Sequence, residues 1–162
     1  DALGDSTTKV RDTRKTTPGM RTLEKYAVRC GGGLNHRMNL SDAALIKDNH
    51  VVAAGGVARA YELIKQRYPD LSVEVEVDSL DQLAEALEVG ADLVLLDNFT
   101  IEELNSAVEF TRGRAKLEAS GGFTFDQAKA VASTGVDFVA VGAITHSAPV
   151  LDIGADLRTE SI

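Results

Sequence analysis

Short apolar runs alternate with helix-like patterns over the second half of the chain. Each run is nearly all apolar or ends on a polar residue, as strands covered on both faces of a sheet do. The runs occupy residues 73–77, 93–96, 115–119 and 138–141. Strands separated by helices predict successive β-α units arranged around a parallel sheet.

Capping signals mark the starts of the helices between these runs. A hydroxyl residue followed three positions later by Glu or Gln forms a capping box, in which each side chain satisfies a free backbone N–H group. The pairs are Ser79 with Gln82, Thr100 with Glu103, and Thr124 with Gln127. Apolar residues follow them at helical spacing: Leu80, Leu83 and Leu87; Ile101, Leu104 and Val108; Phe125, Ala128 and Val131. These stripes predict helices that pack on the sheet.

The first part of the chain is less regular but follows the same logic. Thr17 and Pro18 suit the N-cap and first turn of a helix, which the glycines at 31–33 would end. The apolar positions of this helix are Leu23, Tyr26, Ala27 and Cys30. A second helix is indicated by Val57, Ala60, Tyr61, Ile64 and Tyr68, between the glycines at 55–56 and Pro69. Short strands are predicted at residues 10–13 and 43–46.

The ends of the apolar runs recur at a nearly constant interval. The residues that close them are Lys47, Glu76, Asp97, Ser120 and Gly142. We expect these residues to lie along one rim of the sheet, where α/β folds place their sites. A complete eight-unit barrel needs about 250 residues, so roughly six units fit here. The chain is therefore predicted to form an incomplete or open α/β barrel, with a doubly wound sheet as the second choice. The usual dinucleotide fingerprint and P-loop are absent, which weakens that second choice.

Composition narrows the classes of function. The chain has 162 residues, 44% of them hydrophobic, and a formal charge of −8. This acidic balance argues against non-specific nucleic-acid binding, and no apolar run is long enough to span a membrane. The single cysteine, Cys30, excludes an intramolecular disulfide and is expected to be a small core residue. With no apparent signal peptide, we expect a cytoplasmic, enzyme-like domain.

Charged groups of both signs are predicted to converge on the rim. Cationic donors come from Arg14, Lys15, His36, Arg37 and Lys47, and carboxylates come from Glu76 and Asp97. Arginine and histidine donors suit carboxylate ligands. Carboxylates beside them either hold a divalent cation on a polyphosphate or face a developing positive carbon. The pattern indicates chemistry on an anion.

Glycines at two consecutive strand ends suggest a phosphate site. Residues 120–122 (Ser-Gly-Gly) close one run, and Gly142 closes the next. Bare backbone N–H groups in adjacent loops can hold a phosphate where late barrel strands commonly bind one. Tight strand-to-helix turns would give the same glycines. His146 and Ser147 could contact the phosphate or cap a turn.

Several longer motifs resemble those of the quinolinate phosphoribosyltransferase family, also called nicotinate-nucleotide pyrophosphorylase (carboxylating). The resemblance covers nearly the whole chain in the right order. The matching segments are residues 12–19, 25–28, 31–33, 35–37, 45–50, 75–77, 96–98, 120–122 and 141–147.

The resemblance implies a Mg²⁺-dependent transfer of phosphoribose from phosphoribosyl pyrophosphate to the nitrogen of quinolinate. Loss of one carboxylate as CO₂ then gives nicotinate mononucleotide, a step of NAD biosynthesis. Residue by residue, it implies that Arg14, His36, Arg37 and Lys47 bind the two carboxylates. Catalytic roles would fall to Lys15, which reaches the donor, and to Lys47, Glu76 and Asp97, the last two near the ribose and the metal. The 5′-phosphate would lie among Ser120, Gly121, Gly122, Gly142 and His146.

One feature of the family is missing from these residues. Its amino-terminal α/β sandwich domain, which covers the barrel mouth of a neighbouring subunit and adds an arginine, has no counterpart here. We therefore expect residues 1–162 to be a single α/β-barrel catalytic domain from a longer two-domain chain. The full-length form would be a homodimer or higher homo-oligomer, with no nucleic-acid or membrane partner. Alone, the barrel should keep its fold and perform catalysis poorly.

The sequence is also compatible with other functions. A nicotinate or nicotinamide phosphoribosyltransferase would need to bind at most one carboxylate, whereas Arg14 with His36 and Arg37 favours a dicarboxylate. A non-catalytic phosphate-binding barrel would keep the pocket without turnover. A metal-dependent aldolase would need a Schiff-base lysine or metal-binding histidines, and only Lys47 could serve.

Overall fold

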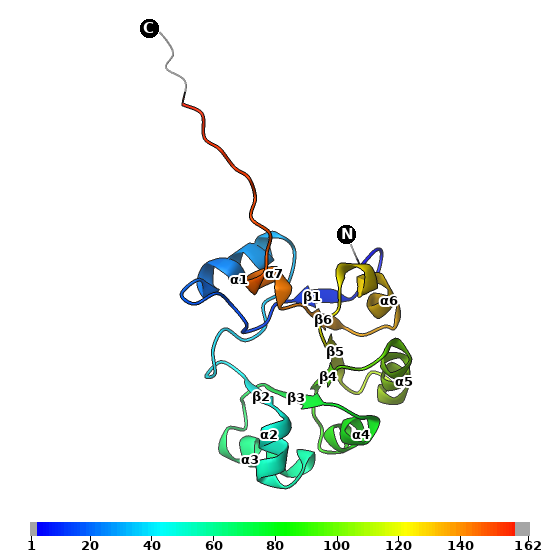
Figure 1. The fold of residues 1–162 in the computed structure, drawn as a ribbon. Helices are drawn as coiled ribbons and strands as arrows, with labels where there is room; N and C mark the ends of the chain where they lie inside the picture. Colours follow the sequence, from blue (N-terminus) through cyan, green and yellow to red (C-terminus); the bar gives the residue numbers. More distant parts are fainter. Residues whose placement is uncertain (1–2, 158–162) are drawn as a thin grey trace.

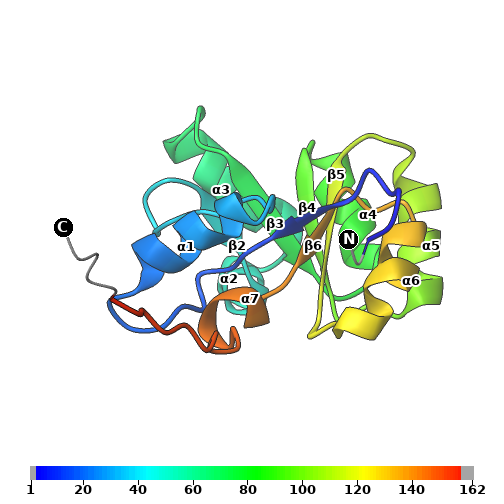
Figure 2. The ribbon, with the colours of Figure 1, turned by 90° about the horizontal axis from the view of Figure 1, so that it is seen from above.

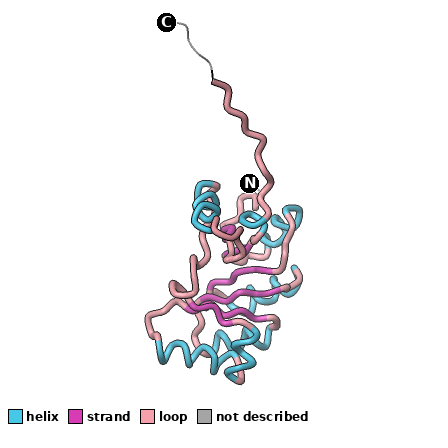
Figure 3. Tube along the Cα trace, turned by 60° about the vertical axis from the view of Figure 1, so that its left-hand side comes forward, coloured by secondary structure: helices cyan, strands magenta, loops and turns pink. Residues whose placement is uncertain are grey.

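The computed structural model describes residues 3–157. Six parallel strands form one sheet in the order β1-β6-β5-β4-β3-β2. Their bounds are β1 Lys9–Arg11, β2 Ala44–Ile46, β3 Val73–Val77, β4 Leu93–Asp97, β5 Lys116–Ser120 and β6 Phe138–Ala140. Within the described residues the edge strands β1 and β2 do not pair with each other. The sheet is therefore an open barrel, as predicted: it is curved but does not close on itself (Figure 1, Figure 3).

The helices confirm the barrel in preference to a doubly wound sheet. They are α1 Arg21–Cys30, α2 Asp48–Ala54, α3 Val57–Arg67, α4 Leu80–Glu88, α5 Ile101–Thr111, the 3-10 turn η1 Phe125–Gln127, α6 Ala128–Ser133 and α7 Ala143–His146. Helices α3 to α6 all lie on the outer side of the curved sheet (Figure 1). A doubly wound sheet would carry helices on both faces. Helices α1 and α7 lie side by side at the open side of the barrel, near β1 (Figure 1, Figure 2).

The apolar core fills the space between the sheet and these outer helices. In β3 every second residue, Val73, Val75 and Val77, is buried in it. Helices α4 and α5 add Leu83 and Leu104, which are fully buried. Successive strand residues point to opposite faces, so the glutamates between these valines face the inside of the barrel.

The first helix begins later than its sequence signals indicate. It starts at Arg21, and its N-cap position is Met20, which makes no side-chain capping bond. Residues 17–20 form a separate turn, in which Met20 N donates to Thr17 O at 2.9 Å. Gly19 adopts a φ of +78° in that turn, and this left-handed conformation keeps the helix from starting at Thr17. The end of the helix at the glycines is confirmed.

Several packing predictions are wrong. Tyr68 and Leu80, both predicted apolar helix positions, are exposed. Cys30 is exposed, and Leu23 and Tyr26 on the same helix are more than half exposed. The apolar stripe of α1 is therefore largely exposed, and the residues that this helix buries are Lys25 and Val28. Phe125 is 78% exposed, because it lies in the 3-10 turn η1, whose tighter spacing takes it off the buried face of Val131.

The predicted caps differ in completeness. At Thr100 both bonds of the capping box form: Glu103 N donates to Thr100 Oγ1, and Thr100 N donates to Glu103 Oε2. Ser79 receives its bond from Gln82 N, but Gln82 Oε1 accepts from Asp78 N instead of from Ser79. The box at Thr124 forms on the turn η1. None of the helices in residues 3–157 is both long and apolar enough for a membrane span.

Candidate functional site

A cavity of about 260 Å³ lies at the carboxyl ends of the strands. It brings together side chains from widely separated segments of the chain. Among its walls are seven residues singled out from the sequence: Arg14, Lys15, His36, Arg37, Lys47, Glu76 and Ser120. The predicted convergence of cations and a carboxylate on one mouth therefore occurs in the structure.

Strand register explains which residues face the cavity. Glu76 lies opposite Leu95, and Leu95 lies opposite Glu118, so these three side chains form one row across β3, β4 and β5. The adjacent row, which contains Val75, belongs to the core on the other face. Because side chains alternate strictly along a strand, one set of strands supplies both the apolar core and the polar cavity.

Lys47 and Glu76 form an ion pair at the edge of the cavity. Lys47 follows β2 and is the N-cap residue of α2, and its Nζ contacts Glu76 Oε2. The Lys47 side chain is 46% exposed, whereas that of Glu76 is 15% exposed. Lys47 N also donates to His50 Nδ1 at 2.9 Å, which fixes the turn into the helix. The lysine can therefore reach a bound molecule while its charge is balanced by the glutamate.

Two arginines share another wall of the cavity. Burial lowers the pKa of the Arg37 guanidinium, and the neighbouring charge of Arg14 lowers it further. Arg37 Nη1 donates to the carbonyl oxygen of Ala43 at 2.9 Å. Arg14 Nε is buried and has no hydrogen-bond partner. Two like charges with an unsatisfied buried donor make a site that an anion would stabilise.

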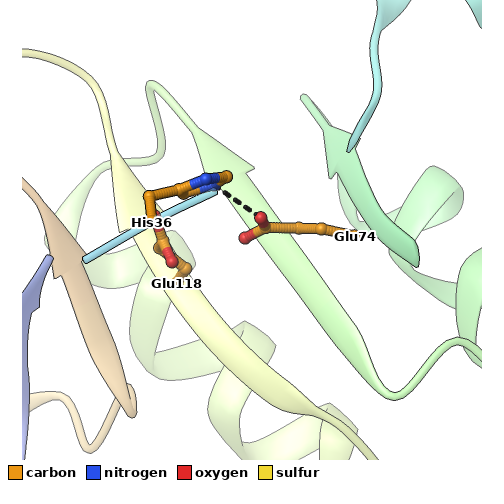
Figure 4. A group of neighbouring side chains, drawn as sticks. All are labelled: His36, Glu74 and Glu118. Atoms are coloured by element: carbon orange, nitrogen blue, oxygen red, sulfur yellow. Dashed lines mark ion pairs between the residues drawn. The ribbon is translucent and has the colours of Figure 1, made fainter. Parts of the chain in front are cut away.

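His36 is buried and uses both ring nitrogens inside the protein. Its Nδ1 accepts a hydrogen bond from Arg37 N at 2.7 Å, and its Nε2 lies 2.7 Å from Glu74 Oε2 (Figure 4). A nitrogen that accepts a backbone N–H bond carries no proton, so the ring proton lies on Nε2 and faces the carboxylate. This arrangement differs from the charged imidazolium that sequence reasoning placed among the cationic donors.

A buried charged cluster at the inner wall of the cavity was missed from the sequence. Arg11 forms ion pairs with Glu118 and, at 3.6 Å, with Glu74. Burial raises the pKa of Glu118 to about 8, and the charge of Glu74 contributes to the rise. The available signal was a glutamate inside each of two predicted strands, Glu74 in β3 and Glu118 in β5.

The cluster does not fit a metal site. His36, Glu74 and Glu118 each bring a potential ligand atom within 4.8 Å of the others. A cation bound at His36 Nε2 would displace the proton to Nδ1, where it would oppose the N–H group of Arg37. The guanidinium of Arg11 already pairs with both carboxylates and occupies the space beside them.

Asp97 and Ser120 end two adjacent strands and lie opposite each other in register. Ser120 lines the cavity, whereas Asp97 is not among its lining residues. Asp97 Oδ2 accepts a hydrogen bond from Asn98 Nδ2 at 2.9 Å. Mg²⁺ is commonly held by one or two carboxylates together with substrate phosphates. Glu76 and Asp97, on neighbouring strands at the same rim, fit that mode of binding.

The glycine loops lie at the same rim, outside the cavity walls. Gly121 has a φ of +133°, and a Cβ there would lie 2.9 Å from Asn98 Cα, so only glycine fits. A Cβ on Gly142 would lie 3.0 Å from His146 Nε2, so the imidazole lies directly over the glycine. His146 Nδ1 is 2.7 Å from Ser147 Oγ. Gly122, with a φ of +71°, has open space around its Cα.

The fold and the cavity together define an open α/β-barrel protein with a cavity lined by cationic side chains at the carboxyl ends of its strands. The sequence profile described as "Quinolinate phosphoribosyl transferase, C-terminal domain" matches residues 1–156, so the chain belongs to this family.

Curated relatives and solved structures agree with this assignment. The nicotinate-nucleotide pyrophosphorylase [carboxylating] of Mycobacterium leprae is 52% identical over 160 residues, which are 97% of this chain and 56% of that protein. The human protein of the same name is 43% identical and matches 94% of this chain and 53% of its own length. The structure of the nicotinate-nucleotide pyrophosphorylase from Francisella tularensis superimposes with a TM-score of 0.87 at 51% identity, covering 89% of this chain and 51% of that one. The chain thus spans about half the length of the relatives it matches.

Proposed function

We propose that this chain is the barrel portion of an enzyme that transfers phosphoribose from phosphoribosyl pyrophosphate to quinolinate and releases CO₂. The products would be nicotinate mononucleotide and pyrophosphate. The observation that carries the proposal is the shared cavity in which Arg14, Arg37 and Lys47 lie together with Glu76. Two arginines and a lysine suit a dicarboxylate, and the acid suits the positive carbon that forms when pyrophosphate leaves.

Quinolinate would be held by the arginine wall and by Lys47. Burial and then the charge of Arg14 lower the pKa of the Arg37 guanidinium, and a carboxylate bound between Arg14 and Arg37 would relieve the repulsion between the two groups. It would also satisfy the buried Nε of Arg14. Holding the ring in one orientation presents its nitrogen to the ribose carbon, and such positioning is a large part of catalysis in two-substrate reactions.

The phosphoribosyl donor would lie across the rim. Glu76 and Asp97 would face the ribose, where positive charge develops as the bond to pyrophosphate breaks. Lys15, at the cavity wall, would reach the donor's phosphates. Ser120, Gly121, Gly122, Gly142 and His146 would surround the 5′-phosphate. Gly122 supports this, since no atom lies within 4 Å of the place that its Cβ would occupy.

Mg²⁺ would be held by Glu76 and Asp97 together with the donor's pyrophosphate. When bound, it would neutralise the charge of the leaving group. Glu76 and Asp97 would orient the ribose and stabilise the positive charge that develops on it. Loss of CO₂ afterwards would be assisted by the positive ring nitrogen that the transfer creates.

The partners and the level of activity follow from the same proposal. Residues 1–162 would form one catalytic domain of a two-domain chain, active as a homodimer or higher oligomer in its full-length form and inefficient without the rest. We propose no nucleic-acid or membrane partner. A cytoplasmic location stays a prediction.

Calorimetric titration separates this function from its alternatives. Quinolinate should bind at least tenfold more tightly than nicotinate, because removing one carboxylate leaves an arginine without a partner. Equal affinities would favour a monocarboxylate phosphoribosyltransferase. Binding of phosphate with no response to quinolinate would favour a non-catalytic phosphate-binding barrel.

A further inference from the structure

His36 is held in a single orientation by contacts on every side. Its backbone N–H group donates to Asp12 Oδ1 at 2.8 Å, and its carbonyl oxygen accepts from the buried Lys25 Nζ at 3.0 Å. Lys25 and Asp12 are completely buried and form an ion pair with each other. The backbone of His36 is therefore fixed to α1 and to the end of β1, and only the ring remains to be placed.

The ring links a strand residue to the arginine loop. On one side its Nε2 contacts Glu74 of β3 at 2.7 Å, and on the other its Nδ1 accepts from Arg37 N at 2.7 Å. Figure 4 shows the Glu74 carboxylate approaching the ring from β3, with Glu118 beside it. The side chains of His36 and Glu74 are 7% and 4% exposed, so water cannot readily replace either partner.

The two ring contacts depend on each other. A neutral imidazole has one N–H group and one bare nitrogen. If the proton lies on Nε2 facing Glu74, Nδ1 is free to accept from Arg37. If it moves to Nδ1, two N–H groups point at each other and the partly buried amide of Arg37 loses its partner, which is costly inside a protein.

The geometry points to Glu74 as a positioning residue that acts on quinolinate binding through His36. By accepting a hydrogen bond from Nε2–H, the Glu74 carboxylate selects the tautomer of His36 whose Nδ1 accepts from the backbone N–H of Arg37. The Arg37 side chain is then held at both ends, by its backbone N–H at His36 and by its guanidinium at the carbonyl of Ala43, and it lines the cavity. His36 thereby links Glu74 of β3 to the backbone of Arg37 at the cavity wall. Arg11 completes the arrangement, because its Nη1 lies 3.6 Å from the other carboxylate oxygen of Glu74, Oε1.

The experiment reads the tautomer directly. In ¹⁵N spectra of the histidine side chains at about pH 8, above the ordinary pKa of histidine, each ring shows which nitrogen carries the proton. His36 in the unmodified chain should show the Nε2–H form. Glu74→Gln should keep the Nε2–H form, since the amide oxygen still accepts a hydrogen bond. Glu74→Leu should lose it, giving a mixture of tautomers. His50 and His146 serve as internal references.

Affinity for quinolinate supplies the second readout, and this part rests on the proposed function. Glu74→Leu should weaken binding at least tenfold, while Glu74→Gln should stay within threefold of the unmodified chain. Asp137→Leu is the matched control, because it also replaces a partly buried acid with leucine. Asp137 accepts from Leu117 N at 2.9 Å and lies at the amino end of the strands, away from the cavity. It should change neither the tautomer nor the affinity.

The outcomes separate the two proposals. An Nδ1–H form in the unmodified chain, or an Nε2–H form retained by Glu74→Leu, would overturn the role of Glu74. Equal losses of affinity in the Gln and Leu variants would also overturn the role of Glu74, since a hydrogen-bond acceptor at position 74 would then make no difference. If the unmodified chain shows the Nε2–H form but does not bind quinolinate, the proposed function fails while the tautomer selection stands. If Glu74→Leu does not fold, the unmodified chain and Glu74→Gln still decide the tautomer.

Discussion

The two faces of strand β3 carry opposite chemistry within five residues. Val73, Val75 and Val77 are at most 2% exposed and belong to the apolar core. Glu74 and Glu76 point the other way, one into a buried ionic cluster and one onto the cavity. The outer face contributes to stability through burial. The inner face carries the cost of desolvating charges, which Arg11, His36 and Lys47 offset by pairing with them.

This contrast shows why the barrel interior holds the site. An apolar face can be repacked with little effect on ligand chemistry, whereas each charge on the inner face depends on a partner from another strand or loop. Substitutions on the outer face should therefore change stability alone. Substitutions on the inner face should change binding or pH dependence, and four measurements test the distinction.

The largest effect is expected on the outer face. Leu83→Ala removes a fully buried side chain of α4 and should lower the free energy of unfolding by about 2–5 kcal/mol, since a cavity is left behind. Urea denaturation followed by circular dichroism measures it. Quinolinate affinity of the remaining folded protein should not change; a parallel loss of affinity would contradict the separation of the two faces.

On the inner face, Arg37→Ala should weaken quinolinate binding by about 1.5–3 kcal/mol, the scale of a charge-assisted hydrogen bond. Calorimetry gives the change. Arg59→Ala is the control, because Arg59 lies on α3 with its side chain 53% exposed and pairs only loosely with Glu62. An unchanged affinity in the Arg37 variant would remove the arginine from the site.

The pH dependence of stability should report on Glu118. Its pKa is raised to about 8 in the folded chain, first by burial and then by Glu74, against the attraction of Arg11. Between the ordinary carboxyl pKa and about 8 the folded state binds one more proton than the unfolded state. Stability should therefore fall as the pH rises through this window, by up to about 1.4 kcal/mol per pH unit.

Glu118→Gln should flatten that slope. Its side chain keeps the shape of the acid but has no proton to lose. Urea denaturation at a series of pH values between 5 and 9 compares the two proteins. The same slope in both would show that another group titrates there.

The smallest effect is expected at an exposed helix end. Thr100→Ala removes the hydroxyl that accepts from Glu103 N at 3.2 Å and should cost about 1 kcal/mol of unfolding free energy. Thermal melting measures this change. Ser106→Ala on the same helix removes a hydroxyl that only donates to its own helix, to Glu102 O, and should change the melting temperature much less.

Much of the fold could be read from local patterns. The strands at 73–77 and after residue 93 were found because apolar runs and caps are properties of neighbouring residues, which fix the local backbone preference. The failures occurred where a single conformation overrode the pattern: Gly19 delayed α1, and the turn η1 exposed Phe125. Neither is visible in the spacing of apolar residues alone.

The sequence by itself determined the order of the β-α units, the residues at the strand ends and the family to which they belong. Only the tertiary structure decided how those residues are paired. Arg11, Glu74 and Glu118 are far apart along the chain, and their cluster exists because parallel register places them on one face of the sheet. The state of His36 was decided in the same way. Which of its nitrogens holds the proton depends on an acid from β3 and on the next backbone amide, and the free energies of buried polar groups depend on such partners.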